Sequence, residues 1–142
     1  MLCIGFAVIG CAPNYNKVLT ENMLEFEIKE QKFIALKVVI EKSNFRFNEK
    51  ILINRFSKEF QEIAQGLGVE SIEINNYQNC PENSIIFNVG KGWNIDVLNV
   101  VQFIYDSCDE RTGKGEKSYD GNHIDIWGLG SDWIMLADTD LI

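Results

Sequence analysis

The chain has 142 residues, a length that fits one domain able to bury roughly two-thirds of the surface its unfolded form exposes. Its 21 acidic and 13 basic residues give a formal net charge of −8, which argues against a protein that binds the phosphate backbone of nucleic acids. We expect a single globular domain over residues 1–142 that needs neither a disulfide nor a metal ion to hold it together.

The first apolar stretch, residues 2–10, allows two interpretations. The motif Val-Ile-Gly ending at Cys11 resembles the cleavage box of a bacterial lipoprotein, in which the cysteine becomes the lipidated N-terminus. A secretory signal carries a basic segment before its apolar core, however, and the first Lys or Arg here is Lys17. The stretch is also shorter than the about 20 apolar residues that span a bilayer. We therefore expect residues 2–10 to form a buried central strand, ended by Pro13.

The next two segments predict a β-hairpin. In residues 24–28 apolar side chains alternate with charged ones, a period of two that places one face of a strand in the core. After the polar break at residues 30–32, residues 33–40 are almost continuously apolar, as in a more buried strand. We expect the two segments to pair as neighbours.

Helical spacing follows the hairpin. Apolar side chains recur three or four residues apart between Leu52 and Leu67, with polar residues on the other side. Asn48 is a suitable N-cap, and Gly66 or Gly68 supplies the left-handed residue that ends such a helix. The spacing therefore predicts an amphipathic helix.

The second half of the chain predicts more strands and a second helix. Residues 71–75 and 84–89 are expected to be short strands. Apolar side chains nearly encircle residues 95–108, which predicts a buried helix N-capped by Asn94. Residues 109–121 lack apolar periodicity and predict a mobile loop.

The chain closes with a predicted hairpin, residues 123–127 and 132–137, joined by a Gly-Leu-Gly-Ser turn. Helices do not alternate strictly with strands in this order. The elements together predict an α+β fold, a largely antiparallel sheet of about six to seven strands with two helices packed on one face.

The cysteines carry no metal or redox spacing. A C-x-x-C motif is absent from the sequence, which argues against zinc and thioredoxin-type sites at Cys3, Cys11, Cys80 and Cys108. In a domain with a full core we expect them to be small buried apolar residues in a reducing compartment. The sequence thus predicts a cytoplasmic protein without a membrane segment, a metal or another cofactor.

Two Gly-Lys-Gly triplets invite comparison with phosphate-binding loops. The triplet around Lys91 joins a predicted strand to a predicted helix, which is where phosphates are held in nucleotide-binding folds. Such loops need more glycine and a Lys-Ser/Thr pair at the helix start, and Trp93 and Asn94 stand there instead. We predict a structural turn. The triplet around Lys114 follows no predicted strand and is a weaker match.

His123 is the only histidine in the chain. With Asp120 and Asp125 it could offer a metal ion one imidazole and two carboxylates. A catalytic metal site draws ligands from several elements, and a second histidine is absent from the sequence. No nucleophile-elbow motif supports a catalytic triad either. We therefore expect no metal ligand and no catalytic residue here.

The aromatic and acidic side chains of the closing hairpin suit a protein-binding surface, because Trp and Tyr are common among interface hot spots. The alternative is that Trp127 and Trp133 simply cap the core. The predicted partner interface comprises Asp120, His123, Asp125, Trp127, Asp132, Trp133, Asp138 and Asp140.

In size, acidity and lack of enzyme motifs, the whole chain resembles the bacterial immunity proteins of contact-dependent and other polymorphic toxin systems. The resemblance implies a small cytoplasmic domain that binds a cognate toxin, often a basic nuclease, and blocks its active site. Carboxylates complementary to a nucleic-acid-binding cleft give fast and specific association. The resemblance rests on no motif, so it transfers no residue.

Two alternative functions stay open. The chain could be a small α+β enzyme or ligand-binding domain in which His123 is the general base. It could also be a secretion chaperone, which exposes apolar patches to an extended client. Replacing His123 with Ala would abolish the activity of an enzyme, whereas reversing Asp125 and Asp132 to Lys would cripple an inhibitor that binds through carboxylates.

Overall fold

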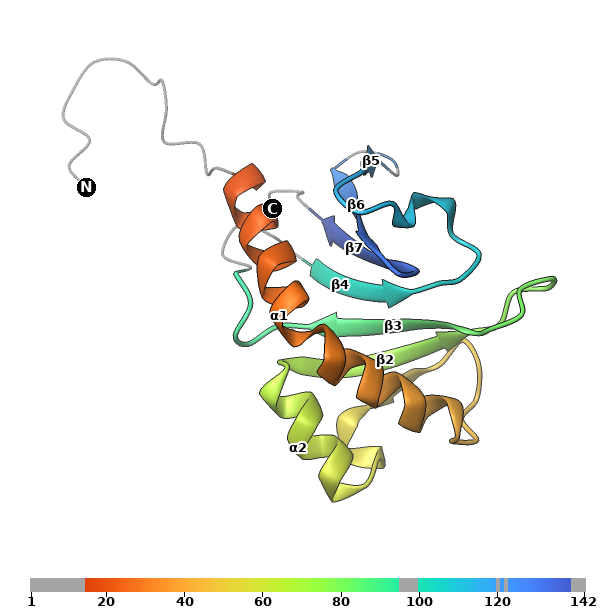
Figure 1. Ribbon diagram of the computed structural model, residues 1–142. Coiled ribbons are helices and arrows are strands. Elements are labelled where there is room, and N and C mark those ends of the chain that lie inside the picture. Colours follow the sequence, from red (N-terminus) through yellow and green to blue (C-terminus); the bar gives the residue numbers. More distant parts are fainter. Residues whose placement is uncertain (1–14, 95–99, 120, 122, 139–142) are drawn as a thin grey trace, which may run out of the picture.

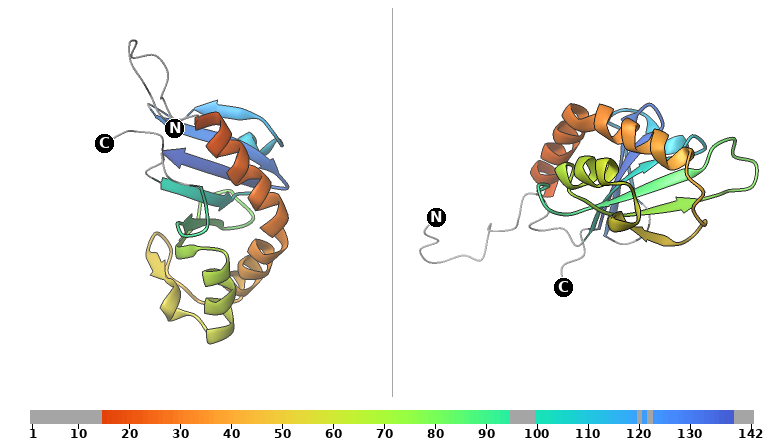
Figure 2. Two further views of the ribbon diagram at one scale, coloured as in Figure 1. Left: turned by 90° about the vertical axis from the view of Figure 1, so that its left-hand side faces the viewer. Right: turned by 90° about the horizontal axis from the view of Figure 1, so that it is seen from below.

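The computed structural model describes residues 15–94, 100–119, 121 and 123–138. In this part of the chain a seven-stranded antiparallel sheet carries two α-helices on one face, which confirms the predicted α+β class (Figures 1 and 2). The strand order across the sheet is β1-β2-β3-β4-β7-β6-β5. The predicted strand at residues 2–10 lies outside the described residues.

The elements in chain order are α1 (Tyr15–Glu41), β1 (Lys50–Leu52), the 3-10 turn η1 (Ile53–Arg55), α2 (Lys58–Gly66), β2 (Val69–Asn75), β3 (Ser84–Val89), β4 (Val100–Tyr105), the 3-10 turn η2 (Glu110–Thr112), β5 (Lys117–Tyr119), β6 (Ile124–Gly130) and β7 (Trp133–Asp138).

Helix α1 occupies the segment for which a hairpin was predicted, so that prediction was wrong. The segment contains no Gly or Pro, and its Glu, Lys, Gln and Leu residues are good helix formers. Ion pairs one turn apart, such as Glu25–Lys29 at 2.8 Å, add local support. The alternation in residues 24–28 has another cause, because α1 is apolar on two opposite sides. Phe26 is 2% exposed, whereas Leu24 and Ile28 point into solvent.

Aromatic packing between α1 and the sheet forms the centre of the core. Phe26 stacks on Phe103 of β4 with ring centroids 4.8 Å apart, and Phe33 meets Phe87 of β3 edge-on at 5.4 Å. Trp133 of β7, 1% exposed, contacts both helix rings. Burying a side chain of this kind contributes about 1.5–3 kcal/mol. These rings therefore hold α1 diagonally across the sheet (Figure 1).

Strand β4 lies where the second helix was predicted, which corrects that prediction. The described part of the segment pairs with β3 on one side and β7 on the other. Strand β4 carries apolar side chains on both faces, with Phe103 in the main core and Ile104 in a second cluster of buried residues, and a buried helix shows a similar pattern. The β-branched and aromatic residues of β4 favour the strand.

The predicted helix between Leu52 and Leu67 is confirmed only in its second half. Its N-cap is Ser57, whose Oγ accepts a hydrogen bond from the Phe60 amide at 3.3 Å, and not Asn48. Gly68, at φ +68°, supplies the predicted left-handed residue after the helix. The predicted strands at 71–75 and 84–89 are confirmed as β2 and β3.

The closing hairpin is confirmed, with a shorter turn than predicted. Ser131 and Asp132 form a two-residue loop with φ +51° and +67°, and positive φ at both positions suits a tight hairpin. The segment predicted as a mobile loop contains η2 and β5. Its backbone lies so close to Gly128 of β6 that any side chain there would collide with the Gly113 carbonyl. This contact covers part of a second apolar cluster on the outer face of the sheet: Ile104, Ile126 and Ile134.

A disulfide joins Cys80, in the β2–β3 loop, to Cys108, just after β4. The expectation of reduced, buried thiols is therefore wrong for this pair. Disulfides are rare in cytosolic proteins, so the bond counts against the predicted cytoplasmic location. Among the described residues, neither α-helix has the combination of length and apolar character that crossing a bilayer demands. Cys3 and Cys11 lie outside the described residues.

We expect loss of this disulfide to destabilise the fold. The Cys80→Ser/Cys108→Ser variant opens a loop that the bond closes over a sequence separation of 28 residues. Loop-closure entropy puts the lost free energy of unfolding at about 3–4 kcal/mol. Urea unfolding followed by Trp fluorescence measures it, with a Cys3→Ser/Cys11→Ser variant as the matched control. Equal unfolding midpoints for the oxidised protein and the Cys80/Cys108 variant would contradict the prediction.

Candidate protein-docking surface

Exposed apolar side chains recur on the outward side of α1, with exposed Gln31 between the first two and the last three of them. Leu24 is 57% exposed and Ile28 78%, and near the other end Val38 and Val39 are 38% and 41% exposed. Together with exposed Ala35, these positions follow helical spacing on the side opposite the core residues. We call Leu24, Ile28, Ala35, Val38 and Val39 the outer stripe. Single exposed apolar residues are normal, whereas several on one side of a helix make that side a candidate interaction surface.

A buried polar pair fixes which side of α1 faces outward. Asn22 is 1% exposed, and its Nδ2 donates to the Asn94 carbonyl at 2.8 Å. In return the Asn94 amide donates to Asn22 Oδ1 at 2.9 Å. The two bonds satisfy a buried amide that would otherwise be costly. Asn94 thus holds α1, and the described part of the helix predicted after it, residues 100–105, is strand β4.

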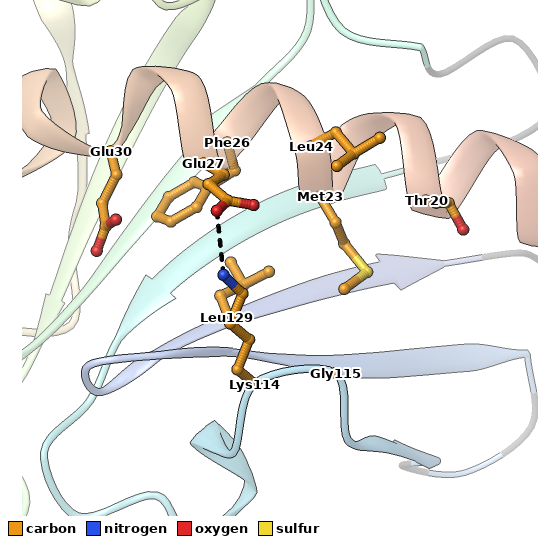
Figure 3. Close-up of a pocket in the computed structure, with 9 residues that line it drawn as sticks. All are labelled: Thr20, Met23, Leu24, Phe26, Glu27, Glu30, Lys114, Gly115 and Leu129. Atoms are coloured by element: carbon orange, nitrogen blue, oxygen red, sulfur yellow. Dashed lines mark hydrogen bonds and ion pairs between the residues drawn. The ribbon is translucent and has the colours of Figure 1, made fainter.

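Hollows flank the outer stripe on both sides. On the side of β6, a pocket of about 230 Å³ opens between α1 and Leu129, with Met23 and Phe26 in its wall (Figure 3). On the side of α2, a second hollow of about 500 Å³ lies between Ala35 and Ile63. The stripe is therefore a ridge between two depressions, and such relief allows the side chains of a partner to interlock with it.

The outer stripe runs toward an acidic end of the sheet, on the right of Figure 1. There Tyr105, the last residue of β4, donates a hydrogen bond to Glu82 Oε2 at 2.5 Å. Burial, this hydrogen bond, and the negative charges of Glu82, Asp132 and Glu41 raise the pKa of Tyr105 above its ordinary value. Lys37 lies 4.0 Å from the Tyr105 ring centroid and pairs with Glu41 at 2.6 Å. Carboxylates from three separate parts of the chain thus converge on one tyrosine.

The disulfide lies at the same end of the sheet. Next to it, Asp106 Oδ1 accepts a hydrogen bond from the Cys108 amide at 2.9 Å. The two sulfur atoms and an Asp106 oxygen lie within 4.8 Å of one another, a spacing that could hold a metal ion. The thiolate is the form that binds metal, and here the sulfur atoms of Cys80 and Cys108 are bonded to each other. The arrangement therefore serves to tie the loops together.

An ion pair beside the disulfide orders the start of the next segment. Arg111 donates to Asp109 through its guanidinium, with Nη2 to Oδ2 at 2.7 Å. The hydrogen bonds from Arg111 lower the pKa of Asp109 although burial alone would raise it. Asp109 also accepts from the Arg111 amide at 2.8 Å and so begins η2.

The two tryptophans of the predicted interface differ in burial. Trp133 is 1% exposed inside the aromatic core, so its side chain belongs to the core and not to the surface. Trp127 is half-buried and packs against the same cluster. On this point the alternative expectation, that the tryptophans cap the core, describes the structure.

The remaining predicted interface residues are scattered. His123 is exposed in a turn before β6, at φ +66°, and Asp132 occupies the β6–β7 turn at the acidic end. Asp138 is the last residue of β7, at the opposite end of the strand from that turn. Asp120 and Asp140 lie outside the described residues, so one member of the metal-ligand set that the sequence analysis rejected (Asp120, His123 and Asp125) also lies outside them.

Asp125 is paired inside the protein. Its side chain is largely buried, and its carboxylate lies 3.6 Å from Lys117 Nζ of β5. Lys117 in turn lies 4.9 Å from the ring centroid of Tyr119 and 5.1 Å from that of Trp127. Burial lowers the pKa of Lys117, but hydrogen bonding to Tyr119 and the charge of Asp125 outweigh it, so the pKa is raised overall. Asp125 therefore neutralises a lysine.

Sequence reasoning missed the outer stripe because the segment was interpreted as two strands. The signal was nevertheless present. Leu19, Phe26, Phe33 and Ile40 recur every seven residues, which is the spacing of one helix face, and all are buried. A second apolar line on the opposite side of that helix would then have stood out as unexplained.

In comparisons with known proteins, no family model, curated protein or solved structure matches the chain.

We expect Lys117→Met to destabilise the fold by about 1–3 kcal/mol at neutral pH, because it leaves the buried Asp125 carboxylate without its cation. A lysine whose pKa is raised by folding contributes its full stabilisation below the unfolded pKa of about 10.5 and loses it as the pH rises further. The difference between the two proteins should therefore shrink in alkaline solution. Urea unfolding of both proteins at neutral pH and again above pH about 10.5 measures the difference in unfolding free energy. Lys58→Met, at an exposed position, is the control. A difference that is absent, or equal at both pH values, would count against this role.

Proposed function

We propose that this chain is a protein-binding inhibitor of the immunity-protein type, which docks on a basic partner through the outer stripe and the adjoining acidic end. The outer stripe is the observation that carries the proposal. Exposed apolar surface gains about 25 cal/mol for each Å² removed from water, so covering the stripe is favourable. Ile28, at 78% exposure, has the most to gain.

The charge of the chain supports a basic partner. The net charge is −8, and the carboxylates of Glu41, Glu82 and Asp132 lie near Tyr105 at the end of the sheet toward which the stripe runs, where Lys37 offsets part of their charge through ion pairs with Glu41 and Glu82. A concentration of one sign of charge speeds the encounter with a partner of opposite sign and disfavours wrong partners. An apolar centre beside a charged rim is also the usual arrangement of a protein interface.

A nuclease-type toxin is the partner that best fits the outer stripe together with the acidic end. Its active-site cleft must be basic to bind phosphates, so carboxylates can occupy that cleft and block it. The cytoplasmic location expected from the sequence stays a prediction. The Cys80–Cys108 disulfide favours an oxidising compartment, in which case inhibitor and partner would meet outside the cytosol.

A secretion chaperone is the second candidate, because exposed apolar residues also serve to hold an extended client. The two functions differ in the state of the bound protein. An inhibitor binds a folded partner and stops its activity, whereas a chaperone binds an unfolded segment.

The test begins with the identity of the partner. A photoreactive amino acid placed at position 28 in the cells of origin should crosslink to one basic protein, which is then purified in folded form. Replacing Leu24 and Ile28 together by Gln should weaken binding to it by about 30-fold, the loss of one hot spot worth about 2 kcal/mol. Isothermal titration calorimetry measures the affinity. An activity assay of the partner shows whether binding inhibits it.

The matched control is Leu52→Gln, since Leu52 is 52% exposed but lies on β1, away from the stripe. It should leave both affinity and inhibition unchanged. The unfolding free energy of the Leu24/Ile28 variant should stay within about 0.5 kcal/mol of the wild type, as expected for a surface change. Crosslinks as frequent from position 52 as from position 28, or full affinity of the Leu24/Ile28 variant, would refute the proposal.

A further inference from the structure

The pocket on the β6 side of the outer stripe has the size of a single side chain. Its volume is about 230 Å³, below the range of about 300–1,000 Å³ that is common for drug-sized ligands. Met23 and Phe26 of α1 form one wall, and Leu129 of β6 faces them (Figure 3). Leu24, the first residue of the stripe, stands at its edge. The pocket is therefore continuous with the surface proposed to bind a partner.

The mouth of the pocket is charged although its walls are apolar. Glu27 and Glu30 lie on successive turns of α1 at the rim, and Lys114 reaches over from the segment before β5 (Figure 3). Lys114 Nζ lies 3.1 Å from Glu27 Oε1. Two carboxylates thus share the rim with one internal lysine.

This ion pair is easily exchanged. The Glu27 and Lys114 side chains are 59% and 67% exposed, and exposed pairs contribute only about 0–1 kcal/mol. Lys114 stands between two glycines, and Gly115 adopts φ +81°, a conformation that other residues rarely take. A lysine on such a segment can leave Glu27 at little cost when another cation replaces it.

We propose that this pocket is the anchor site for the partner: an apolar side chain of leucine or methionine size enters it, and a neighbouring Arg or Lys of the partner displaces Lys114 from Glu27. The inference rests on the proposed function, because it takes the occupant to be a segment of the bound protein. Charge complementarity selects that occupant. The walls favour an apolar group, and the rim carboxylates favour a cation close to it.

The test uses the purified chain and short peptides, so it does not depend on knowing the partner. The probe is acetyl-Leu-Arg-amide, compared with acetyl-Leu-Gln-amide and acetyl-Gly-Arg-amide. Methyl NMR of ¹³C-methionine reports on Met23 in the pocket wall, while Met135, fully buried in the core, is the internal reference. Leu-Arg should shift the Met23 methyl saturably and bind about two- to fivefold more tightly than Leu-Gln. Gly-Arg should cause no saturable shift.

Two variants test the rim. Glu27→Gln should abolish the preference for Leu-Arg over Leu-Gln. Lys114→Gln should raise the affinity for Leu-Arg by about two- to fivefold, because the competing internal cation is gone. A merely structural ion pair predicts the opposite for Lys114→Gln, namely unchanged or weaker binding. That result, or a Met23 shift that is absent or equal with Gly-Arg, would overturn the proposal.

The outcomes also separate this inference from the proposed function. Peptide binding at Met23 without a crosslinked partner at position 28 would support the pocket and refute the inhibitor. A crosslinked partner whose affinity is unchanged by Met23→Trp and by Lys114→Gln would support the inhibitor and refute the anchor site. Because Met23→Trp fills the pocket and could disturb packing, the exposed Lys114 variant keeps the second result interpretable.

Discussion

The stacking of two α1 phenylalanines on the aromatic rings of the sheet is the contact on which the rest of the structure depends. Phe26 and Phe33 are seven residues apart, so they share one helix face and meet Phe103, Phe87 and Trp133 across three strands. Where α1 faces Leu129 of β6, the packing leaves the pocket open. On β5 and β6, Lys117 and the buried Asp125 neutralise each other.

Local signals in the sequence predicted the elements that depend on local chemistry. The left-handed Gly68, strands β2 and β3, and the closing hairpin all follow from turn residues and short runs of alternating or β-branched residues. The two long apolar segments were predicted wrongly for one common reason. A helix that is apolar on two sides resembles a strand in sequence, and a strand with apolar side chains on both faces resembles a helix. Only the long-range pairing of β4 with β3 and β7 resolves the second ambiguity.

The candidate surface was less accessible to sequence reasoning than the fold. Its acidic end brings together residues from the end of α1, the β2–β3 loop and the β6–β7 turn, and no sequence spacing shows that Glu41, Glu82 and Asp132 act on Tyr105. Nor does spacing show that Cys80 meets Cys108, because that pairing depends on the register of β2, β3 and β4. The interface predicted on the closing hairpin assumed outward tryptophans. The core instead takes Trp133, because the largest apolar side chains gain most from burial.

The reciprocal hydrogen bonds between Asn22 and Asn94 decide which side of α1 faces outward. A helix packed only by smooth apolar contacts can rotate about its axis by one residue, about 100°, and still bury apolar groups. Apolar contacts alone would therefore not fix the rotation of α1, which is apolar on two sides. The pair fixes the rotation of the helix about its own axis, since a rotated helix would leave the buried Asn22 amide without these hydrogen bonds. The contact between Asn22 and Asn94, on the inner side of α1, thus helps to determine which residues form the exposed outer stripe.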